Sequence, residues 1–215
     1  MTTRERILKE ALTLFSISGF SSGSVRDISR AVGIKESSLY NHFTNKRDIF
    51  DSLLKEYSGR WEAIFSQVQL TGEDKKIVVD DRTVNMYQNM TPEQFKAVTS
   101  VVFDYYMTDE INVKFRKMLT IEQYRDSEIA TIFRRTSFDD SLEFQAQLFR
   151  ELINQGGFIE TDPYILAVEF FSPIFLIFYK FDSDPESLKA AKNLFERHID
   201  HFNSTYGTKS KEGKS

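Results

Sequence analysis

Apolar side chains recur every three or four residues through most of this chain, which places them on one face of an α-helix. No long segment shows the strict alternation that marks a β-strand, and Gly and Pro, with nine and four residues, are few. We therefore predict an all-α protein. At 215 residues, the chain is long enough to bury a substantial hydrophobic core.

A pair of short helices is predicted between Ser24 and Arg47. Ser24 suits an N-cap, because its hydroxyl can accept a hydrogen bond from a backbone N–H two or three residues on. The stripe that follows consists of Val25, Ile28, Ala31 and Val32. Gly33 then permits a left-handed turn, and residues 35–41 form a second helix with Leu39 facing inward. This is the pattern of a helix-turn-helix, whose second helix enters the major groove of DNA.

The same stretch resembles the tetracycline-repressor (TetR) family of bacterial transcriptional regulators. The family pattern I-A-x-x-A-G-V-S-x-x-x-L-Y-x-H-F-x-x-K corresponds to residues 28–46, which read ISRAVGIKESSLYNHFTNK. Ser29 and Val32 stand where the family has small alanines, and Lys35 stands where it usually has serine. The resemblance covers roughly the first 55 residues and joins about ten positions at fixed spacing.

This resemblance implies two sets of DNA contacts. The residues expected on the phosphate backbone are Ser24, Lys35, Ser38, His42 and Lys46. Those expected near base edges are Arg26, Glu36, Ser37 and Tyr40, while Asn41 suits either role. For each of them the alternative is a solvated surface residue, and for Tyr40 it is packing inside the three-helix head.

A long helix is predicted to begin after Asn45 and to carry apolar residues as far as Val68. It would join the head to a helical body. We expect a DNA-binding domain over 1–47, a ligand-binding and dimerisation domain over 48–206 and a disordered tail over 207–215. By resemblance, helices at 163–181 and 185–203 would form a four-helix interface with their copies in a homodimer.

Residues 164–179 form an apolar run that approaches the length of a membrane span. Glu169 and Pro173 interrupt this run. We therefore predict a core helix buried on all sides, and no membrane partner.

The net charge of −4 is unevenly distributed along the chain. Residues 1–48 hold more Lys and Arg than Asp and Glu, whereas the remainder is acidic. Phosphate contacts need the cations only at the motif, and an acidic body argues against general coating of nucleic acid. The chain has no Cys, and its charged N-terminus lacks the apolar core of a signal peptide. We expect a cytoplasmic protein associated with the nucleoid.

Aromatic residues are concentrated beyond residue 60. The resemblance implies a small-molecule pocket in the body, and a pocket rich in aromatics would suit a hydrophobic, flat or cationic effector. The candidate lining residues are Phe103, Tyr106, Phe115, Tyr124, Phe133, Phe149, Phe171, Phe175 and Phe178. Ordinary core packing is the alternative for each of them.

We find no motif of hydrolases, phosphate-binding loops, zinc proteases or dinucleotide-binding enzymes. His198 and His201 lie three residues apart on the last predicted helix, but a polar surface explains them better than a metal site. We predict no enzyme, no metal and no cofactor. The resemblance to the TetR family implies a repressor that a small, largely hydrophobic effector releases from a palindromic operator in double-stranded DNA. The alternatives are an effector-independent activator or nucleoid-type DNA-binding protein, and an all-α small-molecule-binding protein.

Overall fold

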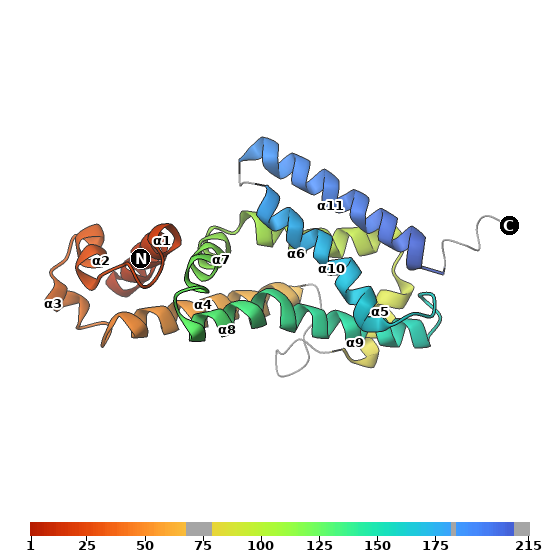
Figure 1. Ribbon diagram of the computed structural model, residues 1–215, viewed down its shortest axis with the longest axis horizontal. Helices are drawn as coiled ribbons and strands as arrows, with labels where there is room; N and C mark the ends of the chain where they lie inside the picture. The colour runs from red at the N-terminus through yellow and green to blue at the C-terminus, as the bar shows by residue number, and fades with distance from the viewer. Residues whose placement is uncertain (68–78, 182–183, 209–215) are drawn as a thin grey trace. The chain divides into compact units, whose positions relative to one another are not determined.

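The computed structural model describes residues 1–67, 79–181 and 184–208. Within these ranges every regular element is a helix (Figure 1), apart from one isolated antiparallel bridge between Phe158 and Gly207. The prediction of an all-α fold is confirmed.

The chain divides into two compact units. The first unit comprises Met1–Trp61 and Asp109–Arg135, and the second comprises Glu62–Thr108 and Thr136–Ser215. These units follow the packing of the helices, whereas the expected boundary at residue 47 follows the DNA-binding segment. The expected domains therefore stay a prediction.

The first unit contains α1 (Thr3–Ser18), α2 (Val25–Val32), α3 (Glu36–Leu39), the start of α4 (Lys46–Gln67), α7 (Glu110–Glu122) and α8 (Ser127–Arg134). Helix α1 packs against both α2 and α7. The core includes Phe115 of α7, which stacks on Tyr57 and Phe50 of α4 with ring centroids 4.3 and 6.4 Å apart. The three-helix head and α7 thus belong to one packed unit.

The second unit contains α5 (Asp81–Asn89), α6 (Pro92–Thr108), α9 (Asp140–Asn154), α10 (Pro163–Lys180) and α11 (Pro185–Tyr206). A π-helical turn, η1 (Arg135–Asp139), links α8 to α9. Helix α10 packs against α9 and α11, and α11 also packs against α6. Val68, the last apolar residue expected on the long helix, lies outside the described residues.

Three helices of the second unit begin at polar side chains that cap them. Thr91 and Gln94 exchange the two bonds of a capping box before α6. Asp162 and Asp184 cap α10 and α11, each followed by a Pro in the first turn.

Helix α10 is not buried on all sides, so that prediction is wrong. Its exposed apolar residues are Tyr164, Ile165, Leu176 and Tyr179, with 44 to 58% of each residue accessible. By length and composition alone, this helix is also apolar enough to span a membrane, with a mean hydropathy of 1.3. Core helices of soluble proteins pass the same test. The exposed stripe arises because α9 and α11 cover only part of the helix surface.

The predicted tail begins too early. Gly207 and Thr208 are paired with the loop after α9, since the Thr208 N–H donates to the Gly157 carbonyl at 3.1 Å. The Thr208 hydroxyl also donates to the Gly156 carbonyl at 2.6 Å. Local composition cannot reveal these partners, because they lie about fifty residues away in the sequence.

Candidate nucleic-acid interface

Helices α2 and α3 meet at the turn that the sequence predicts. The Gly33 backbone is left-handed, with φ 77° and ψ 36°, and its N–H donates to the Ser29 carbonyl at 3.0 Å. Ile28 of α2 and Leu39 of α3 are fully buried and hold the two helices against the core of the head. Ala31 is exposed rather than part of the apolar stripe, because α2 turns that position towards solvent. The turn itself is confirmed.

The predicted recognition helix is shorter than expected. Helix α3 spans only Glu36–Leu39, and turns continue the chain to His42. The Tyr40 N–H still donates to the Glu36 carbonyl, and the His42 N–H donates to the Leu39 carbonyl at 2.9 Å. Tyr40 is 52% exposed, so it is not packed inside the head.

The residues predicted to contact DNA lie mainly at the surface of this head. Eight of the ten are exposed: Ser24, Arg26, Lys35, Glu36, Ser37, Tyr40, Asn41 and His42. Ser38 and Lys46 are half-buried. The surface predicted from the sequence is therefore polar and accessible, and the buried residues Ile28 and Leu39 lie beneath it.

The Ser24 hydroxyl is already engaged at the start of α2. It accepts from the Asp27 N–H at 3.1 Å, which confirms the N-cap, and it donates to the Asp27 carboxylate at 2.5 Å. The bond from Ser24 holds the pKa of Asp27 below its ordinary value. A phosphate at Ser24 would meet this carboxylate, so hydroxyl contact requires the Ser24 side chain to turn.

The Lys46 ammonium points into the loop between α1 and α2. It donates to the carbonyls of Phe20 at 2.9 Å, Ser21 at 3.3 Å and Gly23 at 2.9 Å. It also lies 4.5 Å from the centroid of the Phe20 ring. Burial lowers the pKa of Lys46, while the Glu122 carboxylate acts in the opposite direction. All three donors of the ammonium have partners in the free chain.

The residues predicted to line an effector pocket fall into both compact units. Phe115, Tyr124 and Phe133 belong to the first, and the others belong to the second. Tyr124 is 88% exposed, which does not suit the lining of an enclosed pocket. It follows the end of α7, where the chain turns at the surface.

Several of these aromatic rings pack on one another in the second unit. Phe178 stacks on Tyr106 at a centroid distance of 4.5 Å, and Phe103 lies 5.8 Å from Phe178. Phe149 packs on the rings of Phe170 and Phe202, at centroid distances of 5.7 and 5.5 Å. These contacts are those of a packed core, so an effector would have to displace rings from one another to reach their faces.

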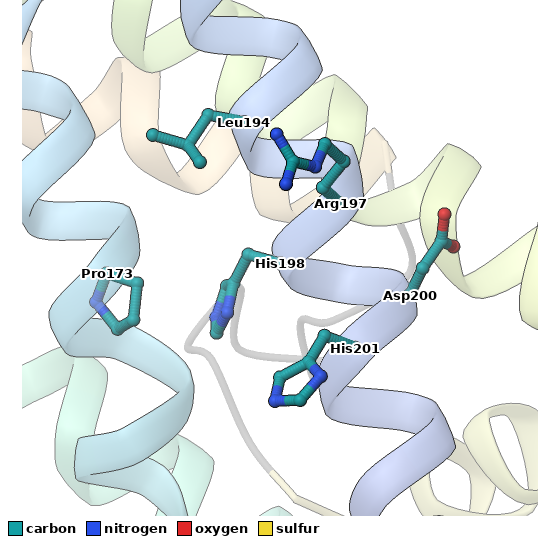
Figure 2. A pocket seen from close by; sticks show the side chains of 6 residues that line it. All are labelled: Pro173, Leu194, Arg197, His198, Asp200 and His201. Carbon is teal, nitrogen blue, oxygen red and sulfur yellow. The ribbon is translucent and has the colours of Figure 1, made fainter.

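An open hollow of about 500 Å³ lies over α10 and α11 (Figure 2). Its lining residues are Pro173, Leu194, Arg197, His198, Asp200 and His201. The His198 Nε2 atom lies 2.8 Å from the Phe170 carbonyl oxygen. No group of three His, Asp or Glu residues suited to holding a metal ion occurs in the described parts of the chain.

The segment that contains the helix-turn-helix is similar to a known family of proteins. Residues 7–53 match the family model for bacterial regulatory proteins of the tetR family. IcaR, the negative transcriptional regulator of the biofilm operon icaADBC in Staphylococcus aureus (strain Newman), is 38% identical over 52 residues. That match covers 24% of this chain and 28% of IcaR, so it spans about a quarter of each protein.

Two solved structures share the fold over nearly the whole chain. SmeT, the repressor of the Stenotrophomonas maltophilia multidrug efflux pump SmeDEF, is 20% identical in its triclosan complex, with a TM-score of 0.66. That likeness covers 97% of this chain and 93% of SmeT. AibR, in complex with isovaleryl coenzyme A and operator DNA, is 16% identical with a TM-score of 0.63, over 91% of this chain and 97% of AibR.

The head of this all-α chain has the helix-turn-helix arrangement, with an exposed polar face, that DNA-binding proteins place in the major groove. Residues 7–53 are therefore similar to the DNA-binding segment of bacterial regulatory proteins of the tetR family, and the chain shares the fold of SmeT and AibR.

Sequence reasoning missed one residue of this unit that bears on the site. Glu122 of α7 is fully buried and contacts the loop before α2. Its partner Ser21 lies 101 residues away in the sequence, and no local pattern joins the two.

Proposed function

We propose that this chain is a sequence-specific transcriptional repressor, released from a palindromic operator by a small, largely hydrophobic effector. It acts in the cytoplasm, bound to the nucleoid, and carries out no catalysis. The observation that supports this most directly is the exposed polar face of α2 and α3, which is fixed on buried Ile28 and Leu39. IcaR is a negative transcriptional regulator and SmeT is a repressor, which favours repression.

Each head would place residues 35–41 in a major groove. Arg26, Glu36, Ser37 and Tyr40 would lie at base edges, where Arg favours guanine and Glu can accept from cytosine. Ser24, Lys35, Ser38, His42 and Lys46 would lie along the phosphates, with Asn41 in either position. Of these, Lys46 would have to exchange a carbonyl partner for a phosphate.

Two copies would associate through α10 and α11. The exposed apolar stripe on α10 and the adjacent hollow on α11 give a surface that a second copy can cover. A two-fold dimer of this kind binds half-sites about one helical turn apart, or a multiple of that spacing.

An effector would enter among the aromatic residues of the body and separate rings that now stack. The complexes of SmeT with triclosan and of AibR with isovaleryl coenzyme A support the proposal that this fold can carry a ligand site. Coupling between an effector and an operator is typically about 1–3 kcal/mol. Thermal unfolding that a broad panel of hydrophobic and aromatic compounds leaves unmoved would count against this part of the proposal.

The direct test is selection of bound fragments from a random DNA pool at two salt concentrations. We expect one palindrome to be enriched, to be lost in Tyr40→Ala and to be kept in Tyr124→Ala. Tyr124 is a matched control, because it is an exposed tyrosine of the same compact unit outside the motif. Binding without a consensus would favour the nucleoid-type alternative, and no binding at either salt would contradict DNA binding.

A further inference from the structure

Charged side chains from two helices hydrogen-bond to the loop between α1 and α2. From α4, the Lys46 ammonium donates to the carbonyls of Phe20, Ser21 and Gly23. From α7, the Glu122 carboxylate takes the donors of Ser21: its N–H at 3.1 Å and its hydroxyl at 2.5 Å. Acceptors and donors of one short loop are thus satisfied by a cation and an anion from two different helices.

Arg125 completes the contact on the α7 side. Its Nη1 atom lies 3.4 Å from the Glu122 carboxylate and donates to the Ser18 carbonyl at 3.2 Å. Gly19 fits against this pair with a φ of +88°, and a Cβ atom there would collide with the Glu122 carboxylate. The backbone therefore lies directly on the acid, with no space for a side chain between them.

Burying the Glu122 carboxylate costs desolvation free energy that its partners must offset. The residue is 0% exposed, and a buried carboxylate is tolerated only when it is paired and hydrogen-bonded. Here it receives the two Ser21 donors, the Arg125 guanidinium and the field of Lys46. These hydrogen bonds are directional, so they restrict the loop to one position more closely than apolar packing alone would.

The loop matters because it leads directly into α2. Gly23 is followed by Ser24, the N-cap of α2, and Arg26 stands in the first turn of that helix. Helix α2 is joined to α3 through the Gly33 turn and the buried Ile28 and Leu39. A shift of the loop would therefore move both helices of the DNA-binding motif.

We propose that Glu122 is a positioning residue for DNA binding: together with Lys46 it clamps residues 19–23 and so sets the orientation of α2 and α3. This inference rests on the proposed function. Glu122 lies outside residues 7–53, the segment that matches the family model, so the clamp ties the motif to a helix of another part of the chain.

The test compares Glu122→Gln and Ser21→Ala with Glu128→Gln in the full-length protein. Glu128 is a matched control, because it is an acid of the same unit that pairs with α4 through Arg47 but does not touch the loop. We expect Glu122→Gln to weaken operator binding by about 3- to 30-fold. Ser21→Ala should act in the same direction by a smaller factor, and Glu128→Gln should stay within about twofold of wild type.

Amide hydrogen exchange in the absence of DNA distinguishes a local loosening of the loop from a general loss of stability. Glu122→Gln should speed exchange of the amides of residues 20–27, while core amides of α1 and α7 keep their protection. Combining Ser21→Ala with Glu122→Gln should add little, because both changes remove the same contact.

Three results would overturn the positioning role. One is an affinity of Glu122→Gln equal to that of Glu128→Gln. The second is faster loop exchange with unchanged affinity. The third applies if Glu122→Gln does not fold: normal binding by Ser21→Ala, which changes an exposed residue and keeps Glu122 together with its Arg125 partner. A wild-type protein that selects no DNA would instead contradict the proposed function, and the positioning role with it.

Discussion

At the scale of single residues, Lys46 illustrates how an expected phosphate contact can have another use. Its three donors are satisfied by loop carbonyls in the free chain. We expect Lys46→Ala to weaken binding to all DNA sequences alike, because the loop loses one side of its clamp. The salt dependence should also flatten by about one unit of slope per head, because the proposed phosphate contact of Lys46 is removed.

The measurement for Lys46 is operator affinity at a series of salt concentrations. Lys35→Ala is the comparison, because Lys35 is exposed and free to reach a phosphate. We expect its slope to fall by about one unit per head. An equal fall in Lys46→Ala would show that Lys46 exchanges a carbonyl for a phosphate on binding.

His198 gives a prediction about pH. Burial lowers its pKa below 6.5, although the bond to the Phe170 carbonyl acts in the opposite direction. The unfolded chain therefore binds more protons than the folded chain below about pH 6.5, so this contribution to stability is complete above that value and is lost as the pH falls.

The prediction is tested with His198→Gln, whose amide can still donate to the Phe170 carbonyl. Its urea midpoint should fall less than that of wild type between about pH 7.5 and about pH 5.5. His42→Gln, which changes an exposed histidine of the other compact unit, should behave as wild type. Parallel curves for wild type and His198→Gln would contradict the assignment.

Single residues also show what the sequence could not reveal. The exposure of Ala31 and Tyr124 and the burial of Glu122 depend on which helices pack together. Apolar spacing gives the face of a helix but does not say which neighbour covers it. A buried acid is also indistinguishable from a solvated one until its partners are known.

At the scale of helices, local signals were sufficient wherever a cap defines the boundary. Ser24 caps the helix that it was expected to start, and the side chains of Thr2, Thr91, Asp162 and Asp184 cap four other helices in the same way. The shortness of α3 and the π-helical turn η1 were not predictable, since both depend on tertiary packing.

Helices α6 and α11 are joined by two ion pairs of opposite polarity. Lys96 pairs with Asp200 at 2.7 Å, and Lys192 pairs with Asp104 at 2.8 Å. These groups are about a third to a half exposed, so each pair contributes at most about 1 kcal/mol. We expect Asp200→Lys to destabilise the protein by about that amount, because it places two cations side by side.

A double-mutant cycle tests this pair. Adding Lys96→Asp to Asp200→Lys should restore part of the lost stability, because it forms the same ion pair with the charges exchanged. Urea unfolding of the two single variants and the double variant gives the coupling energy. Purely additive effects would show that the pair contributes no measurable stability.

At the scale of the whole molecule, the exposed stripe on α10 predicts the oligomeric state. Ile165, Leu176 and Tyr179 are 51, 58 and 44% exposed in the single chain. We expect the wild type to sediment as a dimer at micromolar concentration and Leu176→Glu to sediment as a monomer, because the carboxylate would be buried without a partner. Tyr124→Glu, which places the same charge at an exposed aromatic outside α10 and α11, should remain dimeric. A monomeric wild type would contradict the interface.

The contact between Ser21 and Glu122 limits how freely the parts of such proteins can be exchanged. A chimera that joins residues 1–53 to the body of another regulator would carry the loop but leave behind the acid that holds it, 101 residues further on. Such a graft should recover its DNA affinity only when a glutamate is also introduced at the position equivalent to Glu122. The exchangeable module is therefore larger than the continuous segment that reads DNA.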